Sequence, residues 1–404
     1  MASAVLAGGT ASASDEAASA VNTLGLDLLR EAFPKGNAVL SPYSIQLALA
    51  MAYGGAAGRT VEDMRRTLHY PKSEALLHDS FAELQNDVMG VLARAERARR
   101  SGAGRADAEP MTLLVANRLF AQRGLPIKEP FLELLKVFYG APVELMNFAS
   151  NPAGSEEAIN AWFANQTRQL MQNVVPAGTI DSDTRIVLAN AVYFKGDWQE
   201  SFSETWTLPR AFYLEPGRPV DVPTMKIKSR LFGYEEIPGA TIVTVPFVGG
   251  ELQLVLIVPD PRKTLADVER KLTPASLAQA AHARARPVIL LLPKFRAAPE
   301  STDLMPHLSM LARRAGASAH FTNFSRITDA ERIVLAQVFH KARMAIDEHG
   351  AVAAAATAVV MGGISLRAPE PEPKIVKVNR PFLFGVQHRR SGACLFLGRV
   401  TDPR

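Results

Sequence analysis

The chain has 404 residues, of which 48% are hydrophobic and 21% are charged, with a formal net charge of +5. This composition is typical of a globular protein and excludes a disordered chain. No apolar run reaches the roughly 18 residues that a membrane-spanning helix needs, and the single cysteine, Cys394, excludes an internal disulfide and a cysteine-based zinc cluster.

The first 20 residues are rich in Ala, Ser and Gly, and they contain neither the basic start nor the apolar stretch of a signal peptide. We expect residues 1–13 to be disordered. The composition favours the cytoplasm, and secretion after removal of a signal is the alternative.

Helical patterns dominate the next part of the chain. A helix is predicted after the acidic start at 14–16, where the apolar residues at helical spacing are Val21, Leu24, Leu28 and Leu29. In a second, buried helix Ser41 can cap the start and Pro42 can take the first position. That helix is expected to end at 54–55, and 60–68 predicts another.

Residues 94–109 differ from their surroundings, because arginines alternate there with Ala, Gly and a few acids, and no aromatic residue is present. We interpret this segment as a solvated, inserted loop. Its arginines allow a weak, unspecific contact with a nucleic acid or a glycosaminoglycan, and this polyanion is the one cofactor that we consider. They are Arg94, Arg97, Arg99, Arg100 and Arg105.

Helix and strand patterns interleave from residue 150 onward. The segment 155–170 predicts a helix, and 186–194, a nearly unbroken apolar run that Asn190 interrupts, predicts a strand covered on both faces. Further strands are predicted at 252–258, 288–292, 382–386 and 395–400, the last two as a hairpin. No repeat or linker separates domains, and the alternation favours one α+β body.

Motifs of catalytic chemistry are missing from the sequence. There is no Gly-x-Ser-x-Gly elbow, no phosphate-binding Gly-x-x-x-x-Gly-Lys loop and no His-Glu-x-x-His pair. The eight histidines are scattered, so we predict neither a metal site nor an enzyme.

The segment 347–360 consists mainly of small side chains, with β-branched residues towards its end. In a strand, alternate residues share one side, which would place Ala351, Ala353, Ala355 and Thr357 together. Such a face could enter an existing sheet without overpacking it. An exposed, Ala-rich helical turn is the alternative for this segment alone.

The surrounding motifs resemble the serpin family along nearly the whole chain. Each motif is weak alone, but their ordered series is specific. The hinge pattern of that family, Glu-x-Gly-x-x-Ala-Ala-Ala-x-Thr, matches 348–357, and other motifs match at 37–45, 190–198, 292–295, 340–342, 380–384 and 396–400.

The resemblance implies an α+β fold in a single serpin domain, 1–404, with a large central mixed β-sheet, surrounding helices and an exposed reactive-centre loop at 349–373. It also implies a monomer that inhibits a serine protease as a suicide substrate: the protease is trapped as an acyl complex when the cleaved loop joins the sheet. A serpin fold that instead carries a ligand, acts as a chaperone or stores protein is the alternative.

The resemblance also assigns roles to residues of the sheet. The hinge comprises Glu348, Gly350, Ala351, Ala353, Ala354, Ala355, Ala356 and Thr357. A polar shutter that holds the strands closed comprises Ser41, Ser44, Asn190 and His340, and Trp198 falls at the breach, where insertion starts.

The usual family spacing from Glu348 places the scissile bond between Ile364 and Ser365. A β-branched aliphatic residue suits an elastase-like pocket, and a subtilisin-like target is also considered. Arg367 is the alternative scissile residue and would indicate a trypsin-like target. Two glycines at 362–363 and a long Pro- and Glu-rich segment at 366–374 depart from the common pattern.

Overall fold

The computed structural model describes residues 13–103, 109–351 and 372–404. Its helices are α1 (Ala13–Ala32), α2 (Pro42–Gly55), α3 (Arg59–Thr67), α4 (Glu74–Arg100), α5 (Glu129–Leu134), α6 (Pro152–Gln166), α7 (Leu265–Lys271), α8 (Pro274–Ala280) and α9 (Met305–Arg314), with the helical turns η1 (Leu135–Tyr139) and η2 (Glu204–Trp206). In these described ranges no helix has the length and apolar character required to cross a membrane.

The strands are, in chain order, β1 (Ala38–Leu40), β2 (Thr112–Gln122), β3 (Glu144–Met146), β4 (Ile186–Asp197), β5 (Leu208–Glu215), β6 (Arg218–Ile237), β7 (Ala240–Pro246), β8 (Leu252–Pro259), β9 (Ala285–Pro293), β10 (Phe295–Ala297), β11 (Thr302–Asp303), β12 (Val338–Ile346), β13 (Gly350–Ala351), β14 (Lys374–Lys377), β15 (Phe382–His388) and β16 (Cys394–Val400). Every strand predicted from the sequence is confirmed, including the hairpin of β15 and β16.

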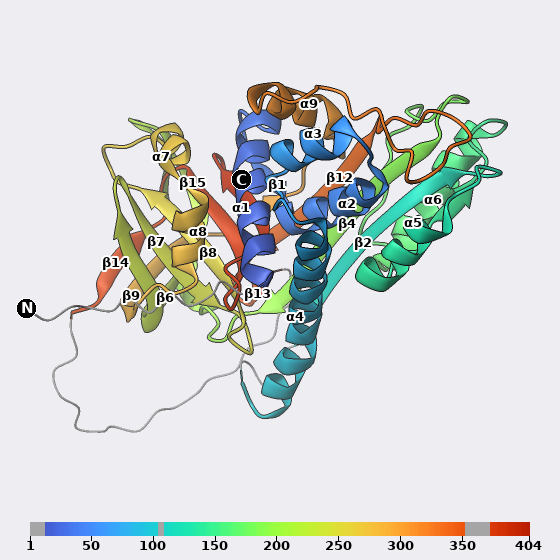
Figure 1. Cartoon of the computed structure of the whole chain (residues 1–404). Coiled ribbons are helices and arrows are strands. Elements are labelled where there is room, and N and C mark those ends of the chain that lie inside the picture. The colour runs from blue at the N-terminus through green and yellow to red at the C-terminus, as the bar shows by residue number, and fades with distance from the viewer. Residues whose placement is uncertain (1–12, 104–108, 352–371) are drawn as a thin grey trace, which may run out of the picture.

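The described strands form two mixed sheets. A nine-stranded sheet has the order β1-β16-β15-β8-β7-β6-β9-β14, with β5 paired to β6, and a seven-stranded sheet has the order β10-β12-β13-β4-β2-β3, with β11 paired to β12. In Figure 1 most strands of the nine-stranded sheet, from β14 to β15, lie on the left with β1 near the centre, and β12, β4 and β2 run obliquely to the right. The α+β architecture that we predicted is therefore confirmed.

The helices α1 and α2 follow the predicted patterns. The apolar stripe of α1 is buried at Val21, Leu24, Leu28 and Leu29, and α2 is buried along its whole length from Pro42 to Gly55. Ser41 caps α2 by accepting a hydrogen bond from the backbone N–H of Ser44, and Pro42 takes the first helical position. This buried helix lies between the two sheets, because it contacts β2, β4 and β16.

Two predicted boundaries are wrong by a few residues. The helix that we placed at 155–170 ends at Gln166, since Arg168 and Gln169 adopt positive φ angles of 52° and 64° that no α-helix contains. At the start of the described chain, α1 begins at Ala13, one residue inside the segment predicted to be disordered, whereas 1–12 lie outside the described residues.

The inserted loop predicted for 94–109 is wrong in its first half, because α4 continues as a helix to Arg100 (Figure 1). Glu96 accepts hydrogen bonds from Arg99 and Arg100 at 2.8 and 2.7 Å, and pairs at spacings of three and four residues stabilise a helix. Arg94 instead pairs with Glu251. The Arg- and Ala-rich stretch up to residue 100 therefore belongs to a helix in which Arg97 and Arg100 are exposed and Ala95 is buried.

Candidate functional site

A buried polar cluster connects the seven-stranded sheet to α2. His340 on β12 and Asn190 on β4 are register partners in the parallel pair of these strands. The backbone N–H of Ser41 donates to His340 Nε2 at 3.1 Å, so Nε2 must carry a lone pair and the ring proton lies on Nδ1. Nδ1 then donates to Asn190 Oδ1, which closes the contact between the two strands.

The same geometry keeps His340 neutral. The residue is only 2% exposed, and burial lowers the pKa of its imidazole to about 3. A second ring proton would lie on Nε2, where it would meet the N–H of Ser41 and remove that hydrogen bond. The predicted shutter histidine therefore links β12, β4 and α2 only in its uncharged form.

The cluster extends through both predicted serines. Ser41 Oγ donates to the carbonyl of Leu395 on β16 at 2.6 Å, and Ser44 Oγ donates to Asn117 Oδ1 on β2 at 2.8 Å. Asn117 is the register partner of Asn190 in the β2–β4 pair and was missed by the sequence analysis. The sequence contained a signal for Asn117, because this polar residue interrupts an apolar strand as Asn190 does. The four predicted shutter residues therefore lie together, with Asn117 as a fifth.

Beyond this cluster, towards the ends of β12 and β4, the two strands separate. β12 and β4 pair in parallel from Val338 opposite Leu188 to Arg343 opposite Tyr193. Beyond that point β13 lies between them, antiparallel to both, with Ala351 opposite Gly196 on one side and a partner on β12 on the other. The sheet thus already contains the start of the segment that we predicted to be an exposed loop from residue 349 on.

The close approach of β13 to β4 requires a glycine at position 350. Gly350 has a φ of +156°, and a Cβ built on it would lie 2.1 Å from the carbonyl oxygen of Gly196. Backbone atoms cannot yield to that contact as a flexible side chain could. The next residue, Ala351, is fully buried, so only a small side chain fits there.

Trp198 lies where β13 enters the sheet. Its indole is fully buried, stacks on Phe247 with ring centroids 4.7 Å apart, and donates from Nε1 to the carbonyl of Asp347 at 2.9 Å. Its backbone N–H donates to the carbonyl of His349 at 2.8 Å. The residue predicted for the breach therefore binds the backbone on both sides of Glu348.

Glu348 is held by side chains that the sequence analysis did not single out. Its carboxylate accepts from Lys294 Nζ at 2.8 Å and from the Thr207 hydroxyl at 2.7 Å. Burial disfavours ionisation of Glu348, but these two hydrogen bonds, a backbone hydrogen bond and the charge of Lys294 together outweigh it, so the pKa of the carboxyl lies below its ordinary value. His349 beside it contacts Glu204 at 2.9 Å. The partners of Glu348 and His349 lie 54 to 145 residues away in the sequence, so no local pattern predicts these contacts.

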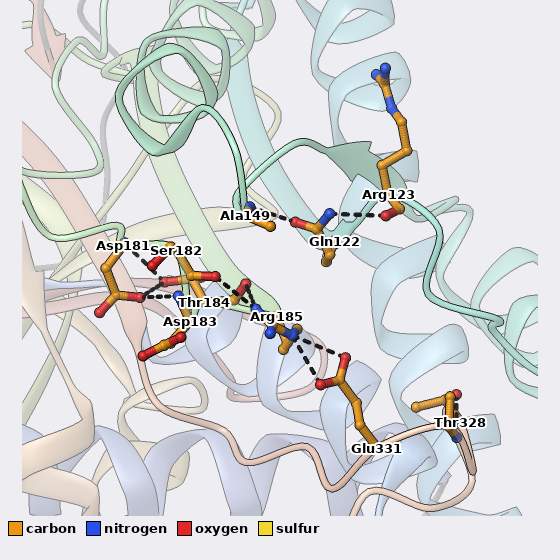
Figure 2. A network of polar contacts seen from close by, with 11 residues as sticks. Gln122, Arg123, Ala149, Asp181, Ser182, Asp183, Thr184, Arg185, Thr328 and Glu331 are labelled. Atoms are coloured by element: carbon orange, nitrogen blue, oxygen red, sulfur yellow. Dashed lines mark hydrogen bonds and ion pairs between the residues drawn. The ribbon is translucent and has the colours of Figure 1, made fainter.

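A second set of contacts ties the opposite end of the strands. Figure 2 shows Arg185, just before β4, donating to both carboxylate oxygens of Glu331 at 3.0 Å. Glu331 belongs to the segment that leads into β12. In the same view Gln122 at the end of β2 donates to the carbonyl of Arg123 and accepts from the N–H of Ala149, each at 2.9 Å. The start of β4 and the segment before β12 are thus linked through partly exposed polar groups.

Several predicted positions lie outside the described residues, and their roles stay predictions. These are the hinge residues Ala353, Ala354, Ala355, Ala356 and Thr357, the scissile candidates Ile364, Ser365 and Arg367, and the basic residue Arg105.

Comparisons with known proteins agree with one another. A family model described as Serpin (serine protease inhibitor) matches residues 19–403. The chain is 33% identical to a serpin-like protein of Thermococcus kodakarensis, over 95% of this chain and 85% of that protein. It is 32% identical to leukocyte elastase inhibitor of Bos taurus, over 96% and 100%, and 32% identical to antithrombin-III of Mus musculus, over 91% and 76%.

Solved structures give the same result at the level of the fold. Serpin48 of the insect Tenebrio molitor matches with a TM-score of 0.76 and 26% identity, over 95% of this chain and 97% of that one. A tumour-suppressing serpin matches with a TM-score of 0.79, over 96% and 100%, and its 23% identity makes that likeness one of fold alone.

Proposed function

The chain belongs to the serpin family, and from this premise we propose that it inhibits a serine protease as a single-use substrate. The observation that carries the proposal is the position of β13. Gly350 and Ala351 lie between β12 and β4, and the small residues of the hinge pattern follow them directly. We infer that insertion starts from these two residues, which already pair with β12 and β4 before any cleavage.

The proposed reaction begins at the loop. The protease's serine oxygen attacks the carbonyl carbon of Ile364, the peptide bond to Ser365 breaks, and the new amine leaves with the proton delivered by the protease's histidine. The acyl-enzyme carries the hinge side of the loop. This arm then enters between β12 and β4 and takes the protease with it.

Insertion replaces one strand interface with two. The parallel pairs between β12 and β4, from 338–343 and 188–193, must separate. The entering strand is antiparallel to both neighbours. Its N–H and C=O groups can pair with β12 along one edge and with β4 along the other, whereas β12 and β4 shared a single interface before insertion. Addition of a strand to a sheet in this way is a known source of binding energy.

We propose an elastase-like target with cleavage after Ile364, and cleavage after Arg367 by a trypsin-like protease is the alternative. Support for the first comes from the spacing to Glu348 and from the aliphatic side chain at 364. Cleavage at 367 would add three residues to the inserting arm.

The test is to mix the purified protein with elastase-like, chymotrypsin-like, trypsin-like and subtilisin-like proteases, run denaturing gels and sequence the released fragment. A band at the summed mass with a new N-terminus at Ser365 is the expected result. A complex with a new N-terminus at Ala368 would move the scissile bond to Arg367. Cleavage without a complex across the whole panel would contradict the proposal.

If no complex forms, the melting temperature of the nicked protein distinguishes a loop that inserts without trapping the protease from a non-inhibitory serpin. A large rise after cleavage would show that the loop still inserts although no protease is trapped. An unchanged melting temperature together with no complex would favour a non-inhibitory serpin that carries a ligand or acts as a chaperone.

For the basic end of α4 we propose at most a weak polyanion contact. Arg94, Arg99 and Arg100 are paired with Glu251 or Glu96, which reduces the positive charge left for phosphates or sulfates. The rate of complex formation, measured with and without a sulfated polysaccharide at low and high salt, tests this contact.

A further inference from the structure

A cleft of about 660 Å³ opens between α7, the turn that joins β5 to β6, and the ends of β15 and β16. None of the hinge, shutter or breach residues that the structure describes lines it. Its volume falls within the range of about 300–1,000 Å³ that small-molecule sites occupy. The cleft is therefore a separate feature that the proposed protease inhibition does not use.

One wall of the cleft is apolar. Tyr213 and Leu214 come from β5, Leu265 from the first turn of α7 and Pro381 from the residue before β15. Tyr213 is 41% exposed although it lines this concave surface, and Leu214 and Leu265 are half-buried. An apolar body of matching size could cover these groups and remove them from water.

The other wall presents the guanidinium of Arg380. It donates only to Oδ1 of its neighbour Asn379, at 2.9 and 3.2 Å, and no carboxylate within the described residues lies at ion-pair distance from it. Burial lowers the pKa of Arg380, an effect that the charge of Asp260 opposes. Asp260 acts on this half-buried cation only from beyond ion-pair distance, so the guanidinium can still receive an anion directly.

Beneath Arg380 the floor of the cleft carries further positive charge. Arg399 and Glu269 form an ion pair at 2.8 Å with both side chains 7% exposed, and Arg30 adds a second guanidinium whose charge acts on the same carboxylate. Nε of Arg399 has no hydrogen-bond partner among the described residues. Arg399, which lines the cleft, and Arg30, which does not, thus act on the single carboxylate of Glu269, and this surplus of positive charge lowers the cost of placing an anion nearby.

The rim does not reverse this balance. Lys35 and Lys263 stand at the opening, against the single acid Glu215. The cleft thus combines an apolar wall, a cationic wall and a cationic rim in one concave surface. Two walls of opposite character are what an amphipathic ligand recognises.

We propose that this cleft binds an amphipathic monoanion, with a carboxylate or sulfonate head at Arg380 and an apolar body over Tyr213 and Leu265. A planar guanidinium can hold such a head through two parallel hydrogen bonds, whereas a lysine could not. The site is independent of the loop, so it does not rest on the proposed inhibition.

The experiment titrates the full-length protein with two fluorescent probes. 1-Anilinonaphthalene-8-sulfonate carries the anionic head, and N-phenyl-1-naphthylamine is its neutral analogue. Arg380→Gln should weaken binding of the sulfonate about tenfold or more and leave the neutral probe within about twofold, because only the charge-assisted contact is lost. Dodecanoate should displace the sulfonate from the wild type at a concentration about tenfold or more below that of dodecanol, because only the carboxylate gains the contact with Arg380.

A second variant keeps the proposal testable if Arg380→Gln fails to fold. Tyr213→Ala removes a partly exposed ring and should weaken both probes, whereas the control Leu231→Ala, at a position 69% exposed on β6 and outside the cleft, should change neither. Sulfonate binding that is equal in the wild type, Tyr213→Ala and Leu231→Ala would overturn the proposal, as would the absence of saturable binding.

Discussion

Protonation of His340 should destabilise the native sheet, and the structure sets the size of the effect. The imidazole is neutral at neutral pH, and burial holds its pKa at about 3, against 6.5 for the free group. Because the folded pKa is lower than the unfolded one, the unfolded chain takes up the proton first as the pH falls. The stabilisation is complete above pH 6.5 and decreases down to about pH 3.

Each pKa unit corresponds to about 1.4 kcal/mol, so the 3.5-unit difference amounts to about 5 kcal/mol over the whole window and to about 3 kcal/mol between pH 6.5 and 4.5. His78 and His388 also have pKa values lowered by burial, so the wild-type pH dependence alone would not identify His340. A variant is therefore needed.

His340→Gln provides the comparison, because a glutamine amide offers one acceptor for the Ser41 N–H and one donor for Asn190 Oδ1, without a titrating group. Urea unfolding of both proteins, followed by tryptophan fluorescence from pH 7.5 to 4.5, gives the midpoints. The variant starts less stable, and its midpoint should fall less steeply with decreasing pH. Parallel curves for the two proteins would refute the assignment of the proton to His340.

Three further predictions concern the hinge. Ala351→Arg should raise the number of inhibitor molecules consumed per protease trapped, because the growing strand would have to hold an unpaired charge between β12 and β4 at a site that is fully buried. Gel titration against the protease measures this ratio, and Leu231→Arg, exposed on β6, should behave as the wild type. Gly350→Ala should destabilise the native state by more than about 1 kcal/mol, as thermal unfolding would show, since its Cβ meets the backbone of β4. Glu348→Gln should cost about 0.5–1 kcal/mol at pH 7, because Lys294 is partly exposed. That loss should shrink in urea unfolding as the pH falls below 4.5, since Glu348 has a lowered pKa and stabilises only while ionised.

An unaltered trapping ratio in Ala351→Arg would show that residue 351 does not have to stay buried between β12 and β4 during the reaction. A melting temperature unchanged by Gly350→Ala would mean that β13 leaves the sheet at no cost. A Glu348→Gln defect that is equal at pH 7 and pH 3.5 would point to packing and not to the ion pair.

The periodic elements were predictable because their signal is local. The apolar run at 186–194 and the hairpin of β15 and β16 carry strand patterns that no other element type matches at that length, and Ser41 and Pro42 mark the start of α2 by capping chemistry. The shutter residues were located through the ordered motifs of a family and not through spacing. Asn117 was missed although it interrupts β2 as plainly as Asn190 interrupts β4.

The remaining errors have physical causes that local patterns do not reveal. At the end of α4 the pairs of Glu96 with Arg99 and Arg100 stabilise a helix that the sequence alone suggested was a loop. The ion pair and the hydrogen bond of Glu348 depend on Lys294 and Thr207, which tertiary folding brings together from distant parts of the chain. Such contacts are fixed by the topology of the sheets.

The short strand β13 fixes how the whole loop would elongate the sheet. Gly350 faces Asp197 and Ala351 faces Gly196, so each step forward along the loop is one step back along β4. Six steps beyond Ala351, Thr357 would arrive opposite Asn190, and the same count from Ile346 on β12 ends at His340. A threonine hydroxyl both accepts and donates, so it can accept a hydrogen bond from the imidazole N–H and donate one to the amide oxygen. Elongation from β13 would thus place the hydroxyl of Thr357 between Asn190 and His340, where it could replace the hydrogen bond that these two residues share before the strands separate.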